Sequence, residues 1–104
     1  MVLIIRRRAA FAVAEIFARY EGEQPGLGLE FMGCFEAACA AIEREPFAAT
    51  PHYREFRRRT LRRFPYTLHY LVTGGNIILS LIFHASRDPN ELYSRLEDDG
   101  PQEQ

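Results

Sequence analysis

The sequence predicts an α+β domain in which a hairpin of two helices packs on a curved antiparallel sheet. Two observations predict this class. Apolar residues recur with a helical period through residues 9–42, and with a strand period of two from residue 64 onward. A Gln-Pro-Gly-Leu-Gly segment at residues 24–28 interrupts the helical part, so its two helices should form an antiparallel hairpin.

The N-terminal half should contain one strand and both hairpin helices. Residues 2–6, Val-Leu-Ile-Ile-Arg, predict a short buried strand. The first helix should cover about residues 9–23. The second should end before Pro46, because the residue before a proline disfavours helical backbone angles. The apolar stripes of the two helices are Ala10, Val13, Ile16, Phe17 and Tyr20, and Leu27, Phe31, Cys34, Phe35, Ala38, Ala41 and Ile42.

Strands should follow beyond Pro51. Residues 54–63 are rich in arginine and alternate only weakly, whereas residues 64–72 alternate clearly. Residues 73–76, Thr-Gly-Gly-Asn, predict a hairpin turn because glycine tolerates positive φ. Residues 77–84 are almost all apolar and predict a central strand buried on both faces. The 64–72 strand should present Phe64, Tyr66, Leu68, Tyr70 and Val72 on one face, and Thr67, His69 and Leu71 on the other.

The C-terminal part predicts a short helix and a tail. Asp88 can cap the helix, Pro89 suits its first position, and Glu91 can reach back in a capping box. The helix should run to about Leu96. We therefore expect a single domain over residues 1–97 and a disordered tail over residues 98–104.

Length and composition exclude several classes of protein. A chain of 104 residues forms one domain, and none of its apolar runs approaches the roughly 20 residues of a membrane span. The N-terminus has its charge after a very short apolar run, the reverse of a signal peptide, so we expect a cytoplasmic protein with no membrane partner. Cys34 and Cys39 should point to different sides of one helix, without a disulfide. No zinc-ligand spacing or cofactor motif is present.

The net charge of −1 conceals an asymmetric distribution of arginine, which supplies all 13 basic residues. A block between residues 54 and 63 is opposed there only by Glu55. Such a block predicts contact with nucleic acid, contact with an acidic protein segment, or a solvated strand face. The six arginines of the block are Arg54, Arg57, Arg58, Arg59, Arg62 and Arg63.

Three stretches, at residues 20–31, 62–70 and 84–89, resemble in their order and spacing the RelE/ParE family of bacterial toxins. Residues 20–31 contain Tyr-Glu, then Gln-Pro-Gly-Leu-Gly and Phe31, similar to the family's helix–turn–helix entry. Residues 62–70 contain Arg-Arg-Phe-Pro-Tyr and then Tyr70, similar to its "RRFPY…Y" strand. Residues 84–89, His-Ala-Ser-Arg-Asp-Pro, resemble the end of its last long strand. The resemblance covers roughly residues 2–96.

The resemblance implies the toxin half of a type II toxin–antitoxin module, of the kind associated with plasmid stabilization and growth inhibition. A cognate antitoxin would wrap the toxin across the helical hairpin and the sheet. Operator DNA would be contacted only through the DNA-binding domain of the antitoxin. RelE-like members cut mRNA in the ribosomal A site, and ParE-like members inhibit DNA gyrase.

The resemblance supplies only part of the nuclease residues. It places Arg58 at one basic position of RelE-like toxins and Thr60 at another, and Thr67 where an active-site arginine is expected. Arg87 and Tyr93 fall near the C-terminal arginine and tyrosine. This incomplete set favours ParE-like gyrase inhibition without catalysis. Alternatives are a ribosome-dependent mRNA endonuclease that uses Arg58, His84, Arg87 and Tyr93, and a degenerate, non-toxic member that only binds its antitoxin.

The remaining candidates allow more than one interpretation. His84 is either a general acid or base beside Arg87, or a strand-end histidine with a structural role. Arg87 either binds a phosphate or pairs with a neighbouring acid. His52 and His69 lack chemical partners in the sequence, and we assign them to surface or edge positions. The candidates for binding the target or the antitoxin are Arg54, Arg57, Arg58, Arg59, Arg62, Arg63 and Arg87.

Overall fold

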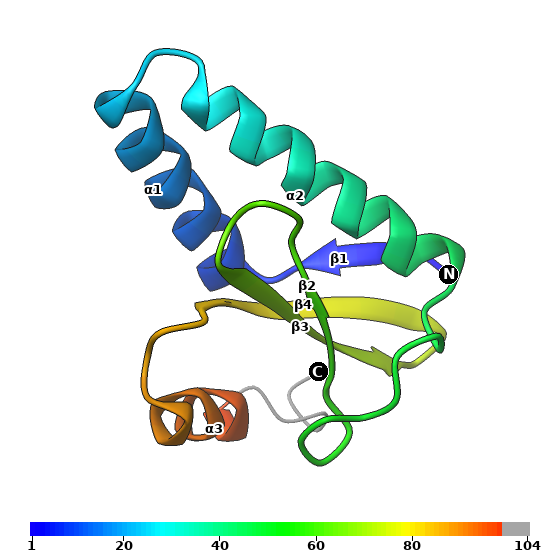
Figure 1. Cartoon of the computed structure of the whole chain (residues 1–104). Coiled ribbons are helices and arrows are strands. Elements are labelled where there is room, and N and C mark those ends of the chain that lie inside the picture. Colours follow the sequence, from blue (N-terminus) through cyan, green and yellow to red (C-terminus); the bar gives the residue numbers. More distant parts are fainter. Residues whose placement is uncertain (99–104) are drawn as a thin grey trace.

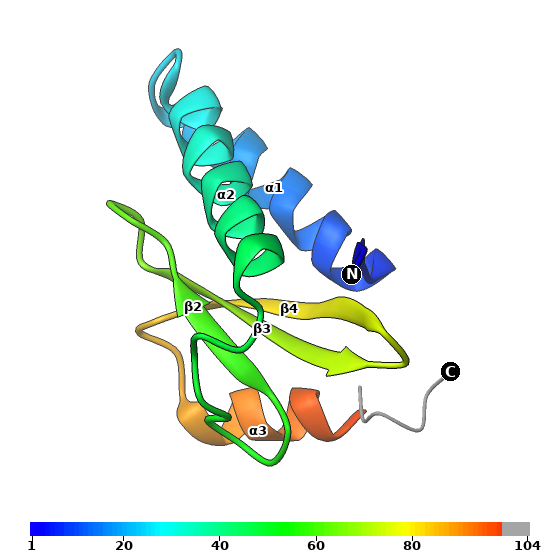
Figure 2. The ribbon, with the colours of Figure 1, turned by 90° about the vertical axis from the view of Figure 1, so that its right-hand side faces the viewer.

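The computed structural model describes residues 1–98 and confirms the predicted α+β class. The helical hairpin of α1 and α2 covers one face of a four-stranded sheet, and α3 covers the other (Figures 1 and 2). The strand order is β1-β4-β3-β2. In chain order the elements are β1 (Leu3–Ile5), α1 (Arg7–Glu23), α2 (Leu27–Arg44), β2 (Arg57–Thr60), β3 (Tyr66–Thr73), β4 (Asn76–His84) and α3 (Pro89–Asp98).

The sheet is mixed rather than wholly antiparallel. The β2–β3 and β3–β4 pairs are antiparallel, whereas β1 pairs with β4 in parallel. The predicted turn between β3 and β4 is confirmed, because Gly74 and Gly75 have φ angles of 60° and 79°. The central strand β4 is buried on both faces, as its apolar sequence predicts.

The prediction of a buried first strand is wrong. β1 lies at the edge of the sheet, where only Leu3 packs against the core. Val2, Ile4 and Ile5 are 63%, 43% and 38% exposed. An apolar strand sequence does not distinguish a central strand from an edge strand.

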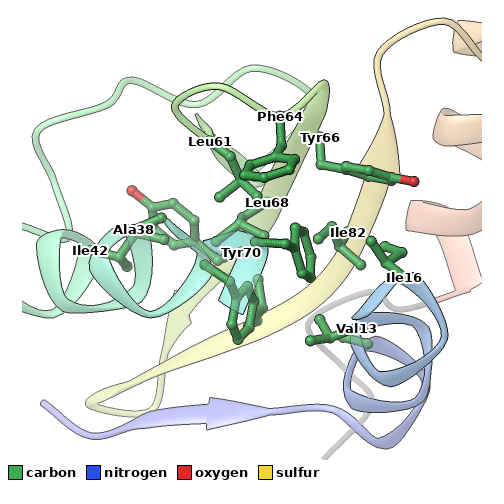
Figure 3. Packing of buried hydrophobic residues seen from close by; sticks show 14 of the residues in the cluster. Val13, Ile16, Ala38, Ile42, Leu61, Phe64, Tyr66, Leu68, Tyr70 and Ile82 are labelled. Atoms are coloured by element: carbon green, nitrogen blue, oxygen red, sulfur yellow. The ribbon is translucent and has the colours of Figure 1, made fainter. Parts of the chain in front are cut away.

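The hairpin face of the sheet holds the larger core (Figure 3). Phe31 of α2 is fully buried and makes edge-on contacts with Phe64 and Tyr66, whose ring centroids lie 5.6 and 6.0 Å away. Phe64, Tyr66 and Tyr70, which we predicted on one face of the 64–72 strand, are all buried in this core. Aromatic edge-to-face pairs of this kind add to the stability that burial of their apolar area provides.

The turn between the helices is held by one carboxylate. Glu21 accepts hydrogen bonds from the backbone N–H groups of Gly26 and Gly28, each at 2.9 Å. Gly26 has a φ of 90°, which favours glycine. A Cβ at Gly28 would lie 2.8 Å from the backbone oxygen of Phe17, so the helices approach too closely for any side chain there. Glu21, Gly26 and Gly28 therefore set the hairpin geometry.

β4 contains a bulge that the sequence pattern does not reveal. His69 pairs with Leu81 and Tyr70 with Leu79, so Ser80 is an extra residue in β4. Leu79 therefore packs in the hairpin-face cluster, and Leu81 in the cluster beneath α3. The Ser80 side chain is fully buried, and its Oγ has no hydrogen-bond partner within residues 1–98.

The smaller cluster lies between the sheet and α3. Its buried residues are Phe56, Leu71, Leu81, Phe83, Leu92 and Leu96. The predicted cap is confirmed, since Asp88 Oδ1 accepts the backbone N–H of Asn90 at 3.0 Å. The predicted capping box is wrong, because Glu91 instead accepts hydrogen bonds from Arg87 and Arg95.

The helix α3 is longer than predicted. It includes Asp98, which belongs to the predicted disordered tail, and the rest of that tail, residues 99–104, lies outside the described residues. Arg8 of α1 donates to the backbone oxygen of Arg95 at 2.7 Å and links the two helices. No helix within residues 1–98 is both long and apolar enough to span a bilayer.

Candidate functional site

The arginine block does not form one surface, because its members lie on different sides of the molecule. Arg57 donates to the backbone oxygen of Ala49, and Arg54 pairs with Glu97. Arg63 pairs with Glu30 of α2 at 2.8 Å. Arg59, Arg62 and Arg63 line a groove along α2, whereas Arg58 lines a cleft beside α3.

That cleft brings together every residue that the sequence proposes for catalysis. It has a volume of about 250 Å³ and lies between the sheet and the start of α3. The strand register explains the arrangement: Arg58 of β2 pairs with His69 of β3, and Thr67 of β3 pairs with Phe83 of β4. Residues two apart share a face of a sheet. The polar residues that line the cleft are His52, Arg58, Thr67, His69, His84, Arg87 and Tyr93.

His69 forms part of this cleft, and its assignment to a surface or edge position is wrong. The residue is only 2% exposed, and its Nδ1 has no hydrogen-bond partner in the part of the chain that the structure describes. Burial, with smaller contributions from the charges of His52 and Arg58, lowers the pKa of His69 to about 4. The imidazole is therefore neutral at pH 7.

His52 also has a chemical partner. Its Nε2 lies 3.3 Å from Nη1 of Arg58. Because an arginine can only donate, Nε2 accepts and the imidazole is neutral in this contact. Desolvation and the neighbouring Arg58 charge lower the pKa of His52. The centroid of the His52 ring lies 6.5 Å from that of Tyr93. The Tyr93 ring in turn stacks on the Tyr53 ring, with their centroids 4.5 Å apart.

His84 is held in one tautomer at the end of β4. Its Nδ1 accepts the backbone N–H of Ser86 at 3.0 Å and lies 2.8 Å from Ser86 Oγ. The neutral ring therefore carries its proton on Nε2. The ring also packs edge-on against Tyr66, 5.0 Å away. These contacts give His84 a structural role and leave Nε2 as its donor to a ligand.

Arg87 is engaged with α3. It pairs with Glu91, which also accepts from Arg95 at 3.0 Å. Its guanidinium lies 5.2 Å from the centre of the Phe83 ring. The pairing with a neighbouring acid, one of the two predicted interpretations, is what the structure shows. Glu91 therefore offsets part of the positive charge at this rim of the cleft.

Thr67 lines the cleft where the family resemblance places an arginine. Its hydroxyl lies 3.4 Å from that of Thr60, the cross-strand partner. A hydroxyl donates a hydrogen bond but brings no charge to a phosphorane. The positive charge of the cleft thus comes from Arg58 and Arg87.

The lining of the cleft is chemically one-sided. Its polar members are arginine, histidine, threonine and tyrosine, with no aspartate or glutamate, and Phe83, Ala85, Pro89 and Leu92 complete the lining. Two neighbouring clefts differ: the one between α1, β4 and α3 includes Glu15, and the groove along α2 includes Glu30. Within residues 1–98, no three His, Cys, Asp or Glu side chains are grouped to hold a metal ion. The α3 cleft is therefore suited to an anion.

Sequence reasoning missed His52 and His69 for a structural reason. His69 shares the alternating face with Thr67, which is visible in the sequence, but its pairing with Arg58 depends on a register that the weakly alternating β2 does not specify. His52 lies in the loop before the Tyr53–Phe56 bridge. No local pattern predicts where that loop lies.

Comparisons with known proteins agree with the fold. No protein-family model and no curated protein matches the chain. Among solved structures, a chain of the structure titled "Chromosomal ParDE TA system from P. aeruginosa" is similar, with a TM-score of 0.74 and 20% sequence identity. The similarity covers 83% of this chain and 97% of that chain. Over most of its length, this chain therefore has the fold of a component of that ParDE system.

Proposed function

We propose that this chain is the toxin of a type II toxin–antitoxin module and that a cognate antitoxin neutralises it. The observation that carries the proposal is the agreement in fold with a chain of a ParDE toxin–antitoxin structure over 97% of that chain. The stretches that resemble RelE/ParE toxins also support it, because they have structural roles: Glu21 holds the hairpin turn and Asp88 caps α3.

We further propose that the toxin acts as ParE-like toxins do, by inhibiting DNA gyrase without catalysis of its own. Two features of the cleft support this target. Thr67 supplies no charge where RelE-like nucleases are expected to have an arginine. Arg87 is paired with Glu91 rather than free for a scissile phosphate.

The test measures gyrase directly. Purified full-length chain at micromolar concentration should reduce supercoiling of relaxed plasmid by gyrase or trap cleaved DNA. Heat-denatured chain at the same concentration serves as the unfolded control. Gyrase activity that is unchanged at a molar excess of folded protein would reject this target while leaving the toxin–antitoxin assignment open.

A second candidate, a ribosome-dependent mRNA endonuclease, is favoured by the convergence of Arg58, His84, Arg87 and Tyr93 in one cleft. In such a reaction a base would take the proton of an RNA 2′-hydroxyl, and His84, which carries its proton on Nε2, would be the acid. The 2′-oxygen would then attack the adjacent phosphorus as the bond to the 5′-oxygen breaks, and an acid would protonate that leaving oxygen. Arg58 would stabilise the phosphorane.

This candidate has its own readout. Translating ribosomes incubated with the chain should yield new mRNA 3′ ends, and Arg58→Ala should remove them. Ribosomes whose mRNA stays intact would exclude cleavage. Normal growth after antitoxin-free induction of soluble protein would instead favour a non-toxic member that only binds its antitoxin.

A further inference from the structure

We propose that the cleft between α3 and the sheet is a phosphate-binding site in which His69 and His52 contact the ligand. The proposal depends neither on gyrase nor on RNA cleavage as the cellular target. It concerns two residues that the catalytic candidates do not include.

The first argument is the state of His69. Buried polar atoms nearly always have a hydrogen-bond partner, and the exceptions need an explanation. The Nδ1 of His69 has no partner within the described chain, and the residue lines an open cleft. Ser80 Oγ is likewise unpartnered, but it belongs to the β4 bulge and lines none of the three polar clefts. His69 is thus the buried residue with an unpartnered polar atom that lines this cleft.

The second argument is the convergence of donors. Arg58 is the cross-strand partner of His69, and its Nη1 contact with His52 occupies only part of a guanidinium with five donors. His84 has its Nδ1 engaged with Ser86, which leaves Nε2–H to donate. A planar guanidinium beside neutral imidazoles matches the several acceptor oxygens of a phosphate group.

The third argument is that the cleft lining holds no carboxylate and that Glu91, at its rim, is paired with Arg87 and Arg95. No carboxylate is among the residues that line this cleft, whereas Glu15 and Glu30 line the neighbouring ones. The volume of about 250 Å³ is sufficient for a phosphate group. Tyr93, beside His52, offers a ring on which a nucleobase can stack. The ligand is therefore either inorganic phosphate or the phosphate group of a nucleotide.

The experiment follows the histidine rings by NMR while the full-length chain is titrated with inorganic phosphate at constant ionic strength. Phosphate should shift the signals of His69 and His52 and raise the pKa of both rings. His69→Leu and Arg58→Ala should each weaken binding at least tenfold. Arg58 is exposed, so its variant tests the proposal even if a change at His69 disturbs folding.

The matched control is Arg59→Ala. Arg59 is also exposed and adjacent in β2, but it lines the groove along α2 instead. Its loss should leave phosphate binding unchanged. Equal weakening by Arg58→Ala and Arg59→Ala would mean that general surface charge holds the anion, and would overturn the site. Unshifted His69 signals at saturating phosphate would overturn it as well.

Separate titrations distinguish the source of the phosphate. Uridine monophosphate and RNA and DNA oligomers of one sequence are compared with inorganic phosphate. Tighter binding of a nucleotide ligand that competes with inorganic phosphate and shifts Tyr93 assigns the site to nucleotides. Equal affinity for free phosphate and uridine monophosphate, with Tyr93 unshifted, assigns it to phosphate alone. Absence of competition between the ligands would contradict a single site.

Discussion

The two faces of the sheet differ in the size of their apolar core and in whether their buried polar groups have hydrogen-bond partners. On the hairpin face, polar groups at the edge of the core have partners: Tyr70 donates to the backbone oxygen of Pro46 at 3.0 Å, and Tyr66 accepts from Arg19. On the α3 face, a smaller apolar cluster adjoins a cleft that contains an unpartnered buried histidine. The hairpin face holds the larger core, and the α3 face carries the polar groups that we propose contact a ligand.

The largest expected effect lies on the hairpin face. Replacing Phe31 with alanine should lower the free energy of unfolding by about 3–5 kcal/mol, because a fully buried ring is lost and the surrounding rings close only partly around the cavity. Urea denaturation at pH 7 measures the change. Phe11→Ala, which removes a ring that is 65% exposed, should change stability by about 0.5 kcal/mol or less. A loss below 1 kcal/mol for Phe31→Ala would show that this face is not the main core.

The α3 face should make stability sensitive to acid. The pKa of His69 is about 4 in the folded protein and about 6.5 when unfolded, so the unfolded chain binds the proton more readily. The stability that depends on neutral His69 is present above pH 6.5 and is lost as the pH falls toward 4. The loss should be about 3 kcal/mol between pH 7 and pH 4, at about 1.4 kcal/mol for each pKa unit.

The comparison for this pH effect is His69→Leu, which has nothing to protonate at that position. Its stability should fall less steeply over the same range, and at pH 7 it should be at least as stable as the natural chain, because an unpartnered buried polar group is removed. Unfolding curves of both proteins at several pH values test the difference. Parallel profiles would show that His69 is not buried and neutral.

Alanine substitutions at two glycines of α2 distinguish the effect of close helix packing on stability from the effect of helix propensity. Gly28→Ala should destabilise the protein by about 1–3 kcal/mol, since its Cβ would meet the backbone oxygen of Phe17 at 2.8 Å. Gly33→Ala has nothing within 4 Å of its Cβ and should stabilise by about 0.5–1 kcal/mol. Thermal unfolding of both variants gives the sign of each change in stability. Equal effects would argue against the close approach of α1 and α2.

The smallest effect is expected from the ion pair between α2 and the loop after β2. Arg63 and Glu30 have side chains that are 60% and 50% exposed, so solvent screens their attraction. A double-mutant cycle with alanine at both positions should give a coupling of about 0.2–1 kcal/mol. A coupling above 2 kcal/mol would mean that this ion pair stabilises the protein more than expected for two side chains so exposed to solvent.

Most of the fold could be predicted from the sequence because its elements have clear periods and turn residues. The helices, the Gly74-Gly75 turn and the Asp88 cap follow from local patterns. The parallel position of β1, its exposure and the Ser80 bulge do not, because they depend on which strands become neighbours. The capping box fails because Glu91 is within reach of two arginines.

The candidate site was predictable only in part. Motif resemblance indicates Arg58, His84, Arg87 and Tyr93, and the structure brings all four to one cleft. His69 becomes part of the site through its pairing with Arg58, which weak alternation in β2 leaves open. Strand register and loop placement, rather than residue type, therefore limit what the sequence predicts about this site.

The target of the proposed toxin is tested most directly by pulse-labelling cells after induction of the chain without antitoxin. Incorporation of labelled thymidine and of labelled amino acids is compared over the first minutes. The proposed inhibition of gyrase predicts an early fall in thymidine incorporation while amino-acid incorporation continues. An early fall in amino-acid incorporation would contradict it and would make the α3 cleft, with Arg58 and His84, the place to look for mRNA cleavage.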